Sequence, residues 1–301
     1  MKKLVFEACF GIALLMGTVV TLSSCSEEVT NPENQKVYAP VSVQVCAFSV
    51  SMEDFPNTRA AVSPSDYAGV KAMTLAFYDA NGEETYKVTQ LKSDDPSAFG
   101  QFSCSLPVGS YTLVAVAYNY FANDVFTLTS PTVAAFTSAF PRETFCTTQT
   151  VSITDDMPVS LSITLNRINA LLAIYSNDQR PADAVYVRTT YSAGCKGFNP
   201  STGLASNANG FSVVNELKEA VGQTVEVVNN AFLATDLQTM DITLEVLDQN
   251  SQVLCTKVVP NVPLKRSRMT FLEGNLFSPS SPFTVGFSLN TDWQTSNTVT
   301  F

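Results

Sequence analysis

From residue 37 the sequence reads Val37-Tyr38-Ala39-Pro40-Val41-Ser42-Val43-Gln44-Val45-Cys46-Ala47. Each odd-numbered position holds Val or Ala, and the residues between them are mostly Tyr, Ser or Gln. A period of two over this length predicts a half-buried β-strand, because successive side chains of a strand point to opposite faces of a sheet. The segment Glu53-Asp54-Phe55-Pro56-Asn57 then has the composition of a turn.

The rest of the chain repeats this arrangement of short apolar runs separated by turn residues. Val70 to Tyr78 and Tyr86 to Leu91 flank Asp79-Ala80-Asn81-Gly82, and Asn-Gly between two such runs predicts a hairpin because the turn needs positive φ. Further strands are expected at residues 99–106, 110–118, 145–153, 159–165, 170–175, 184–190, 224–233, 241–247, 252–259 and 283–289.

Several local expectations follow from the same pattern. Segments 99–106 and 110–118 should pair around Pro107-Val108-Gly109. Asp248-Gln249-Asn250 should form the hairpin turn between the strands expected at 241–247 and 252–259. We expect a short helical turn within 130–140, a helix at 214–221 and a loop at 196–210, which is rich in Gly, Asn and Ser. The overall prediction is an all-β fold of two β-sandwiches in series, joined at residues 166–169.

The N-terminus has the composition of an export signal. Lys2-Lys3 precede an apolar run from Ala8 to Val20, which is too short for a typical membrane span. The signal ends in Leu22-Ser23-Ser24-Cys25, which resembles a bacterial lipobox, so we expect cleavage between Ser24 and Cys25 and lipidation of Cys25. The predicted organisation is a signal at 1–24, a tether at 25–36, and β-sandwiches at 37–166 and 167–301.

The composition excludes several classes of function. Without residues 1–24, which hold Lys2, Lys3 and Glu7, the 17 basic and 27 acidic residues fall to 15 and 26. An acidic chain is a poor partner for nucleic acid. The absence of histidine excludes Ser-His-Asp and Cys-His nucleophile systems and most zinc sites. We therefore predict no catalytic residue, no metal and no cofactor, and a protein that is not an enzyme.

The remaining reactive and charged groups have ordinary interpretations. Asp94-Asp95 and Asp155-Asp156 are expected to be solvated turn acids, and Lys265-Arg266 with Arg268 a solvated basic loop. Five cysteines follow Cys25, an odd number without a CxxC pair, and no disulfide is specified. Those within apolar or alternating runs are expected to be small buried hydrophobes: Cys46, Cys104 and Cys255.

Several short motifs occur in a fixed order along the chain after the lipobox. They are Thr58-Arg59-Ala60, Phe77-Tyr78-Asp79-Ala80-Asn81-Gly82, Leu106-Pro107-Val108-Gly109-Ser110-Tyr111-Thr112, Leu165-Asn166-Arg167-Ile168, Asn261-Val262-Pro263-Leu264-Lys265-Arg266 and Thr270-Phe271-Leu272-Glu273-Gly274-Asn275-Leu276. Together they resemble the Bacteroidales fimbrillin superfamily, the FimA-like and Mfa-like subunits and anchors of adhesive surface fimbriae. The family fold, two transthyretin-like β-sandwiches, agrees with the strand pattern.

The resemblance implies a mechanism of assembly. In shaft subunits an arginine-specific protease removes the lipid and the first strand, and a strand of the next subunit fills the open groove by β-augmentation. Here the cut would fall between Arg59 and Ala60. The displaced strand would include Val37, Val41, Val43 and Val45, and a C-terminal donor candidate carries Phe283, Val285, Phe287 and Leu289. In anchors Arg59 stays uncut, and the sequence leaves shaft, tip and anchor open.

The resemblance thus implies a structural component of fimbriae at the outer membrane and extracellular surface. Its partners would be other fimbrial subunits, the membrane through Cys25 and a host surface ligand. The alternative is a surface lipoprotein that binds glycans for an outer-membrane uptake system. That function calls for several exposed aromatic side chains on loops, and the loop at 194–210 offers Phe198.

Overall fold

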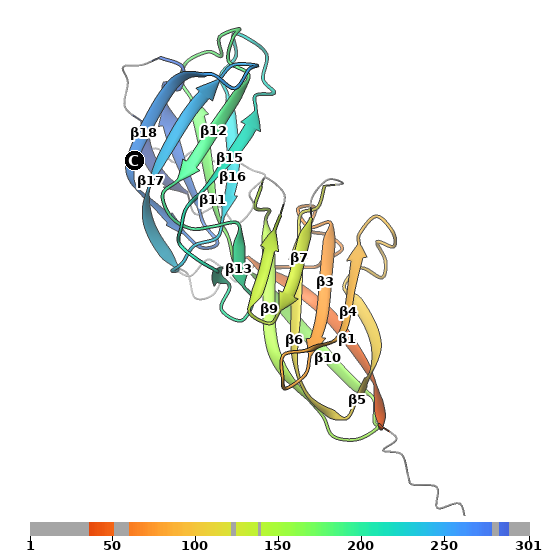
Figure 1. Ribbon diagram of the computed structural model, residues 1–301. Coiled ribbons are helices and arrows are strands. Elements are labelled where there is room, and N and C mark those ends of the chain that lie inside the picture. Colours follow the sequence, from red (N-terminus) through yellow and green to blue (C-terminus); the bar gives the residue numbers. More distant parts are fainter. Residues whose placement is uncertain (1–35, 51–59, 122–124, 138–139, 279–282, 289–301) are drawn as a thin grey trace, which may run out of the picture. The chain divides into compact units, whose positions relative to one another are not determined.

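The computed structural model describes residues 36–50, 60–121, 125–137, 140–278 and 283–288 (Figure 1). Every regular element within these ranges is a β-strand, which confirms the all-β fold. No helix in the described part of the chain is therefore long and apolar enough to cross a membrane. The signal, Cys25, Arg59 and Trp293 lie outside the described residues.

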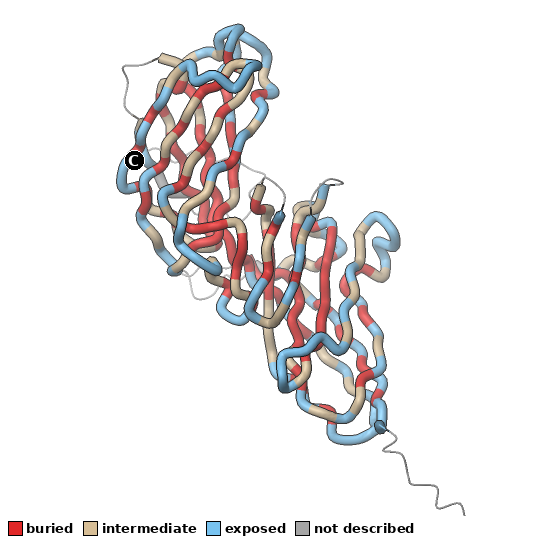
Figure 2. Tube along the Cα trace, in the orientation of Figure 1, coloured by how far each residue is buried: buried red, intermediate tan, exposed pale blue. Residues whose placement is uncertain are grey.

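The first half of the chain folds one bent sheet around a core. One part of it holds β5 (Gln101–Pro107), β1 (Tyr38–Val50), β10 (Val159–Arg167) and the short β2 (Ala60–Val62). The other part holds β9 (Thr144–Ile153), β6 (Gly109–Tyr118), β3 (Ala72–Tyr78) and β4 (Glu84–Leu91). The two parts join only where Asn166 and Arg167 of β10 pair with Cys146 and Phe145 of β9. Side chains from both parts form the same hydrophobic core. The buried residues that contribute to it are coloured red along the trace in Figure 2.

The second half contains two further sheets of four strands. One has the order β16 (Glu226–Ala231), β11 (Ala170–Ser176), β19 (Met269–Gly274) and β20 (Thr284–Ser288). The other has the order β15 (Phe211–Glu216), β12 (Tyr186–Tyr191), β17 (Leu237–Leu247) and β18 (Val253–Lys265). Both contribute to a second core, separate from the first.

A small fourth sheet takes strands from both halves. Its order is β14 (Leu204–Ala205), β13 (Gly197–Asn199), β8 (Val133–Phe136) and β7 (Phe126–Ser130). Phe126, Phe136, Phe198 and Phe232 pack together beneath it. Residues 36–301 accordingly form one compact unit, and their division into domains at 37–166 and 167–301 stays a prediction.

Two hairpin turns are built alike, and both were predicted. In the β3–β4 turn, the carboxylate Oδ1 of Asp79 accepts hydrogen bonds from the backbone N–H of Asn81 (2.8 Å) and Glu83 (2.9 Å). In the β17–β18 turn, Oδ1 of Asp248 accepts from Asn250 and Gln252, both at 2.8 Å. Such turns hold the backbone by a local acceptor, which is why Asp favours them.

Four local predictions were wrong because tertiary pairing decided them. β5 and β6 do not pair with each other: β5 pairs with β1, whereas β6 lies between β3 and β9. Residues 133–136 form a strand of the small sheet rather than a helical turn. Residues 211–216 form β15, which pairs with β12 and replaces the expected helix. The predicted loop at 196–210 contains β13 and β14.

Two side-chain predictions also need correction. Arg268 is 4% exposed, so it does not lie in a solvated loop. Its neighbour Arg266 is partly exposed and pairs with Asp236 at 2.5 Å. Cys46 is exposed rather than buried, Cys104 and Cys255 are half-buried, and none of the five described cysteines forms a disulfide.

The shared sheet predicts coupled unfolding of the two cores. Phe198 is fully buried, with its ring centroid 4.8 Å from that of Phe232. Phe198→Ala should cost about 3–5 kcal/mol and split one calorimetric unfolding transition into two, since it opens a cavity where the halves meet. The control is Phe77→Ala, which truncates a fully buried side chain within the first core. It should lower the stability without splitting the unfolding transition into two. Identical transitions in the two variants would contradict the coupling.

Candidate functional site

The strand predicted to be displaced occupies the middle of its layer. β1 pairs antiparallel with β5 from Tyr38 to Gln44, and parallel with β10 from Val41 to Ser49. Its last three residues also pair with β2. β1 is therefore hydrogen-bonded along both backbone edges, and its removal would leave a slot between β5 and β10 (Figure 1).

The side chains of β1 follow the predicted alternation as far as Val45. Val41, Val43 and Val45 are at most 2% exposed, whereas Val37, which precedes the strand, is 51% exposed and lies outside the core. Cys46 faces outward like the even-numbered residues before it, and a β-bulge between Val45 and Ala47 then reverses the alternation, so that Phe48 and Val50 are buried. Such a bulge adds one residue and turns the following side chains to the other face.

An aromatic cluster holds the end of β1 beyond the bulge. The Phe48 ring stacks on Phe145, with centroids 4.8 Å apart, and meets the edge of Tyr67 at 5.8 Å. The Tyr67 hydroxyl donates to Glu143 Oε1 (2.6 Å) and accepts from Arg167 Nη2 (2.7 Å). Arg167 and Glu143 form a buried ion pair at 2.8 Å. Burial raises the pKa of the Tyr67 hydroxyl, so it stays protonated and can donate.

A lysine fixes the segment that follows β2. The ammonium group of Lys92 donates to the backbone carbonyls of Pro64 (3.0 Å), Ser65 (2.8 Å) and Tyr67 (3.1 Å). Burial lowers the pKa of this ammonium group. The chain is thus held by Lys92, just after β4, from Pro64 onward, whereas among the described strands β2 pairs with β1 alone.

The structure describes some of the site residues predicted from the sequence and leaves others outside its described ranges. Ser24, Cys25, Arg59 and Leu289 lie outside the described residues. Ala60 opens β2. Phe283 packs against the second core and Val285 is 38% exposed. β20, which includes Phe287, pairs with β19 at the edge of its sheet.

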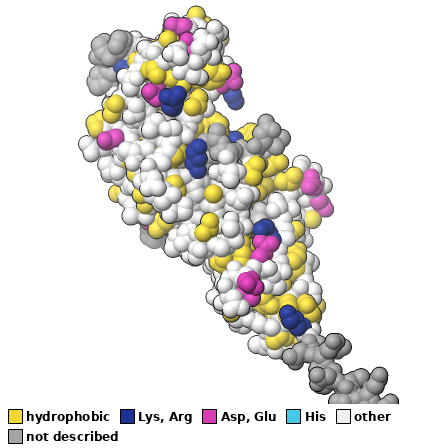
Figure 3. Space-filling view, in the orientation of Figure 1, with side chains coloured by type: hydrophobic (Ala, Val, Ile, Leu, Met, Phe, Trp, Pro, Cys, Tyr) yellow, Lys and Arg dark blue, Asp and Glu magenta, His cyan; other side chains and the backbone are white. Residues whose placement is uncertain are grey.

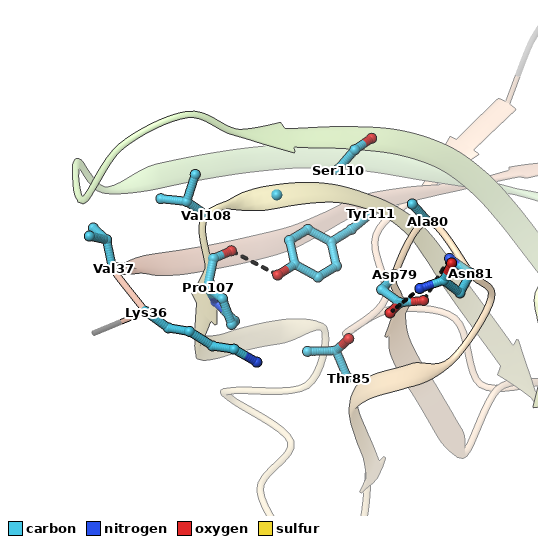
Figure 4. A pocket seen from close by; sticks show the side chains of 11 residues that line it. Lys36, Val37, Asp79, Ala80, Asn81, Thr85, Pro107, Val108, Ser110 and Tyr111 are labelled. Atoms are coloured by element: carbon cyan, nitrogen blue, oxygen red, sulfur yellow. Dashed lines mark hydrogen bonds between the residues drawn. The ribbon is translucent and has the colours of Figure 1, made fainter. Parts of the chain in front are cut away.

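A pocket of about 350 Å³ opens beside the start of β1 (Figure 4). Three segments line it: the two residues before β1, the β3–β4 hairpin, and the β5–β6 turn with the start of β6. The lining residues are Lys36, Val37, Asp79, Ala80, Asn81, Thr85, Pro107, Val108, Gly109, Ser110 and Tyr111. Two of the motifs on which the family resemblance rests, 77–82 and 106–112, therefore meet at one place in the structure.

The walls of this pocket are held in place by local hydrogen bonds. Tyr111 donates its hydroxyl proton to the carbonyl of Pro107 at 2.7 Å, and the ring packs edge-on against Phe77. The Val108 N–H donates to the carbonyl of Val37 at 2.8 Å, which ties the β5–β6 turn to β1. Hydrogen bonds from the backbone of Glu83 and Asn81 lower the pKa of Asp79, so its carboxylate is charged at neutral pH.

Outside this pocket, the described surface gives few indications of a binding or catalytic site. Charged side chains are scattered singly or in small groups over the face drawn in Figure 3. Asp94, Asp95, Asp155 and Asp156 are exposed in turns, as predicted. Among the described residues no group of three acids or cysteines comes close enough to hold a metal ion.

The ion pair of Arg167 and Glu143 was not predicted from the sequence, nor were the three backbone carbonyls that accept hydrogen bonds from Lys92. Arg167 stands in the predicted join, where its neighbours Asn166 and Asn169 suggest a polar linker. The pairing of residues 24 positions apart in sequence is visible only in the fold. The pocket could have been suspected, because both hairpin motifs were noted, but nothing in the sequence brings them together.

The chain is thus an all-β protein whose first long strand, β1, is paired with β5 on one edge and with β10 on the other. The chain belongs to a family of unknown function (DUF6562), whose family model matches residues 39–300. No curated protein matches it in sequence.

Solved structures extend the comparison to the fold. A Bacteroides thetaiotaomicron protein of the DUF1812 family, proposed to bind polysaccharide, is 12% identical with a TM-score of 0.51, covering 82% of this chain and 95% of that one. A proposed adhesin from Bacteroides ovatus is 9% identical with a TM-score of 0.50, covering 85% and 96%. The fimbrial anchor protein Mfa2 from Porphyromonas gingivalis is 13% identical with a TM-score of 0.48, covering 78% and 90%. The likeness to the first two structures shows that this chain shares their fold.

Phe48 should carry much of the stability of β1. Phe48→Ala removes a fully buried ring from a stacked cluster, so it should lower the free energy of unfolding by about 3–5 kcal/mol in urea titrations. Cys46→Ala, two residues earlier on the exposed bulge, should change it by less than about 0.5 kcal/mol. Equal effects of the two substitutions would mean that the strand is not packed as described.

The β3–β4 turn should respond to acid. Asp79 has a lowered pKa in the folded chain, so the hydrogen bonds to its carboxylate are complete above the ordinary aspartate value of 3.8 and are lost as the pH falls through the lower, folded value. The amide NMR shifts of Asn81 and Glu83 should titrate together with a midpoint below 3.8. Asp79→Asn should abolish this titration. A midpoint above the ordinary value would refute the assignment.

Proposed function

We propose that the chain is a structural component of adhesive fimbriae on the cell surface, exported as a lipoprotein and assembled with other subunits by β-strand donation. The observation that carries the proposal is the position of β1. It is enclosed by β5 and β10, and it lies between the expected lipid at Cys25 and the expected cleavage site after Arg59. One cut would thus free lipid and strand together.

Energetics explain why a covalent cut would be needed. Six side chains of β1 are at most 3% exposed: Ala39, Val41, Val43, Val45, Phe48 and Val50. The larger ones contribute about 1.5–3 kcal/mol each on burial, so an incoming strand of similar sequence gains about as much as the resident strand. While tethered, the resident strand has the advantage of a high effective concentration. Cutting the tether removes that advantage.

The local contacts agree with a cut at residue 59. β2 pairs with β1 alone, so the first residues after the cut would become available to pair with the replacement strand. The ammonium group of Lys92, the residue after β4, holds the chain at Pro64, Ser65 and Tyr67, which would keep the new N-terminus in place beside the slot.

The donor candidate at 283–289 stays a proposal. β20 is paired on one side, with β19, whereas β1 is paired on both. An edge strand has fewer backbone hydrogen bonds to lose, and exposed strand edges are suited to pairing with another chain. The Bacteroides ovatus protein described as a proposed adhesin shares this fold, and its description supports the proposal that the present chain acts at the cell surface.

The test is N-terminal sequencing with an intact mass of protein taken from the surface of its own cells. We expect a start at Ala60 in the polymer, and Arg59→Lys should retain the lipidated N-terminus and prevent polymer formation. Arg266→Lys, which changes a partly exposed arginine elsewhere, should be processed normally. A lipidated start at Cys25 in assembled wild-type protein would exclude strand exchange at this slot and leave the role of an anchor.

A further inference from the structure

The pocket beside the start of β1 has a mixed lining that the proposed assembly does not use. Along its walls lie the ammonium group of Lys36, the side-chain amide of Asn81 and the hydroxyl groups of Thr85 and Ser110. Within the described part of the chain, the structure gives no hydrogen-bond partner for the Lys36 ammonium or for either hydroxyl. These groups supply both donors and acceptors to a ligand.

Apolar surface lies between these polar groups. Val37 and Val108 are 51% and 42% exposed at the rim, and the adjacent Tyr38 is 52% exposed. A ligand that alternates hydroxyl groups with C–H faces matches such a lining. Exposed aromatic rings with a polar tip suit contacts of this amphipathic kind.

Other ligand classes fit less well. A phosphate or other anion would find one cation, Lys36, in the same pocket as the charged Asp79. A divalent cation would find a single carboxylate, whose Oδ1 already accepts two backbone hydrogen bonds. The Asn81 amide donates to Asp79 Oδ2 at 3.4 Å, but a purely apolar ligand would cover the hydroxyl groups of Thr85 and Ser110 and leave them without partners, which is costly.

We propose that this pocket binds a neutral saccharide. Its volume of about 350 Å³ lies near the lower end of the range of about 300–1,000 Å³ for small-molecule sites, which suits a mono- or disaccharide. The hairpin is held before binding, because Asp79 Oδ1 accepts hydrogen bonds from the backbone N–H groups of Asn81 and Glu83. The amide of Asn81 and the hydroxyl of Thr85 bind sugar hydroxyl groups, and the Tyr111 oxygen accepts a further hydrogen bond.

The site includes the two residues that lead into β1, since Lys36 and Val37 form one wall. Val37 is tied to the opposite turn through the hydrogen bond from Val108. A saccharide bound across these segments therefore stabilises the resident strand. The proposal does not depend on strand donation, because the pocket is complete in the uncleaved chain.

The test is an NMR titration of the purified full chain with the methyl glycosides of galactose, glucose, mannose, fucose and N-acetylglucosamine, and with lactose. At least one sugar should shift the backbone amides of Ala80–Gly82 and Val108–Tyr111 with millimolar affinity. Asn81→Ala should weaken that affinity about tenfold, through loss of hydrogen bonds made by one side chain. Lys36→Met, at the opposite wall, should also weaken it.

Asn250→Ala is the matched control, because the β17–β18 turn has the same Asp-centred hydrogen bonds but does not line the pocket. It should leave sugar binding unchanged. Thermal unfolding of both variants near that of the wild type would establish that they are folded. The proposal is overturned if no sugar shifts these amides at tens of millimolar, or if the two asparagine variants bind equally well. Neither result would bear on N-terminal processing at Arg59.

Discussion

The pairing of β1 between β5 and β10 is the interaction on which the first sandwich depends. Main-chain hydrogen bonds run along both edges of the strand, and its inward side chains fill the core between the two parts of the bent sheet. Among the strands that the structure describes, β5 pairs with β1 alone, and it meets β4 through side chains such as that of Gln90, whose Nε2 donates to the Gln101 carbonyl at 2.7 Å. Loss of β1 without replacement would therefore expose apolar side chains, leave β5 without a strand partner and leave β10 paired with β9 through its last two residues alone.

The two ends of β1 lie in different surroundings. At its start the strand borders an open pocket with polar walls, and beyond the Cys46 bulge it ends in a closed aromatic cluster. The bulge makes this difference, since it turns Phe48 inward toward Phe145 and Tyr67. A replacement strand would need to match that change of alternation, with an apolar side chain at the position of Phe48, to satisfy the same core.

The cluster behind Phe48 also connects the two halves of the chain. Arg167 binds Tyr67 and Glu143, and its carbonyl accepts a hydrogen bond from Ser267 next to β19. Asn169 is fully buried; its Oδ1 accepts from the Thr144 N–H at 2.9 Å, and its carbonyl accepts from the Ser267 N–H. The segment 166–169, predicted as the join between two sandwiches, is therefore packed and hydrogen-bonded. Buried polar groups of this kind are stable only when they are paired, which restricts the geometry of the join.

The sequence by itself determined the local elements of this protein. The alternation from Ala39 to Val45 specified a strand with one buried face, and Asp79-Ala80-Asn81-Gly82 and Asp248-Gln249-Asn250 specified hairpin turns, because side-chain direction and turn geometry depend on neighbouring residues alone. Tertiary structure decided the rest. It selected β1 as the partner of β5, turned residues 133–136 and 211–216 into strands, and buried Arg167 and Arg268, because strand pairing and burial depend on residues far apart in the chain. The pocket belongs to this second group, since its walls come from three segments that meet only when the sheet has folded.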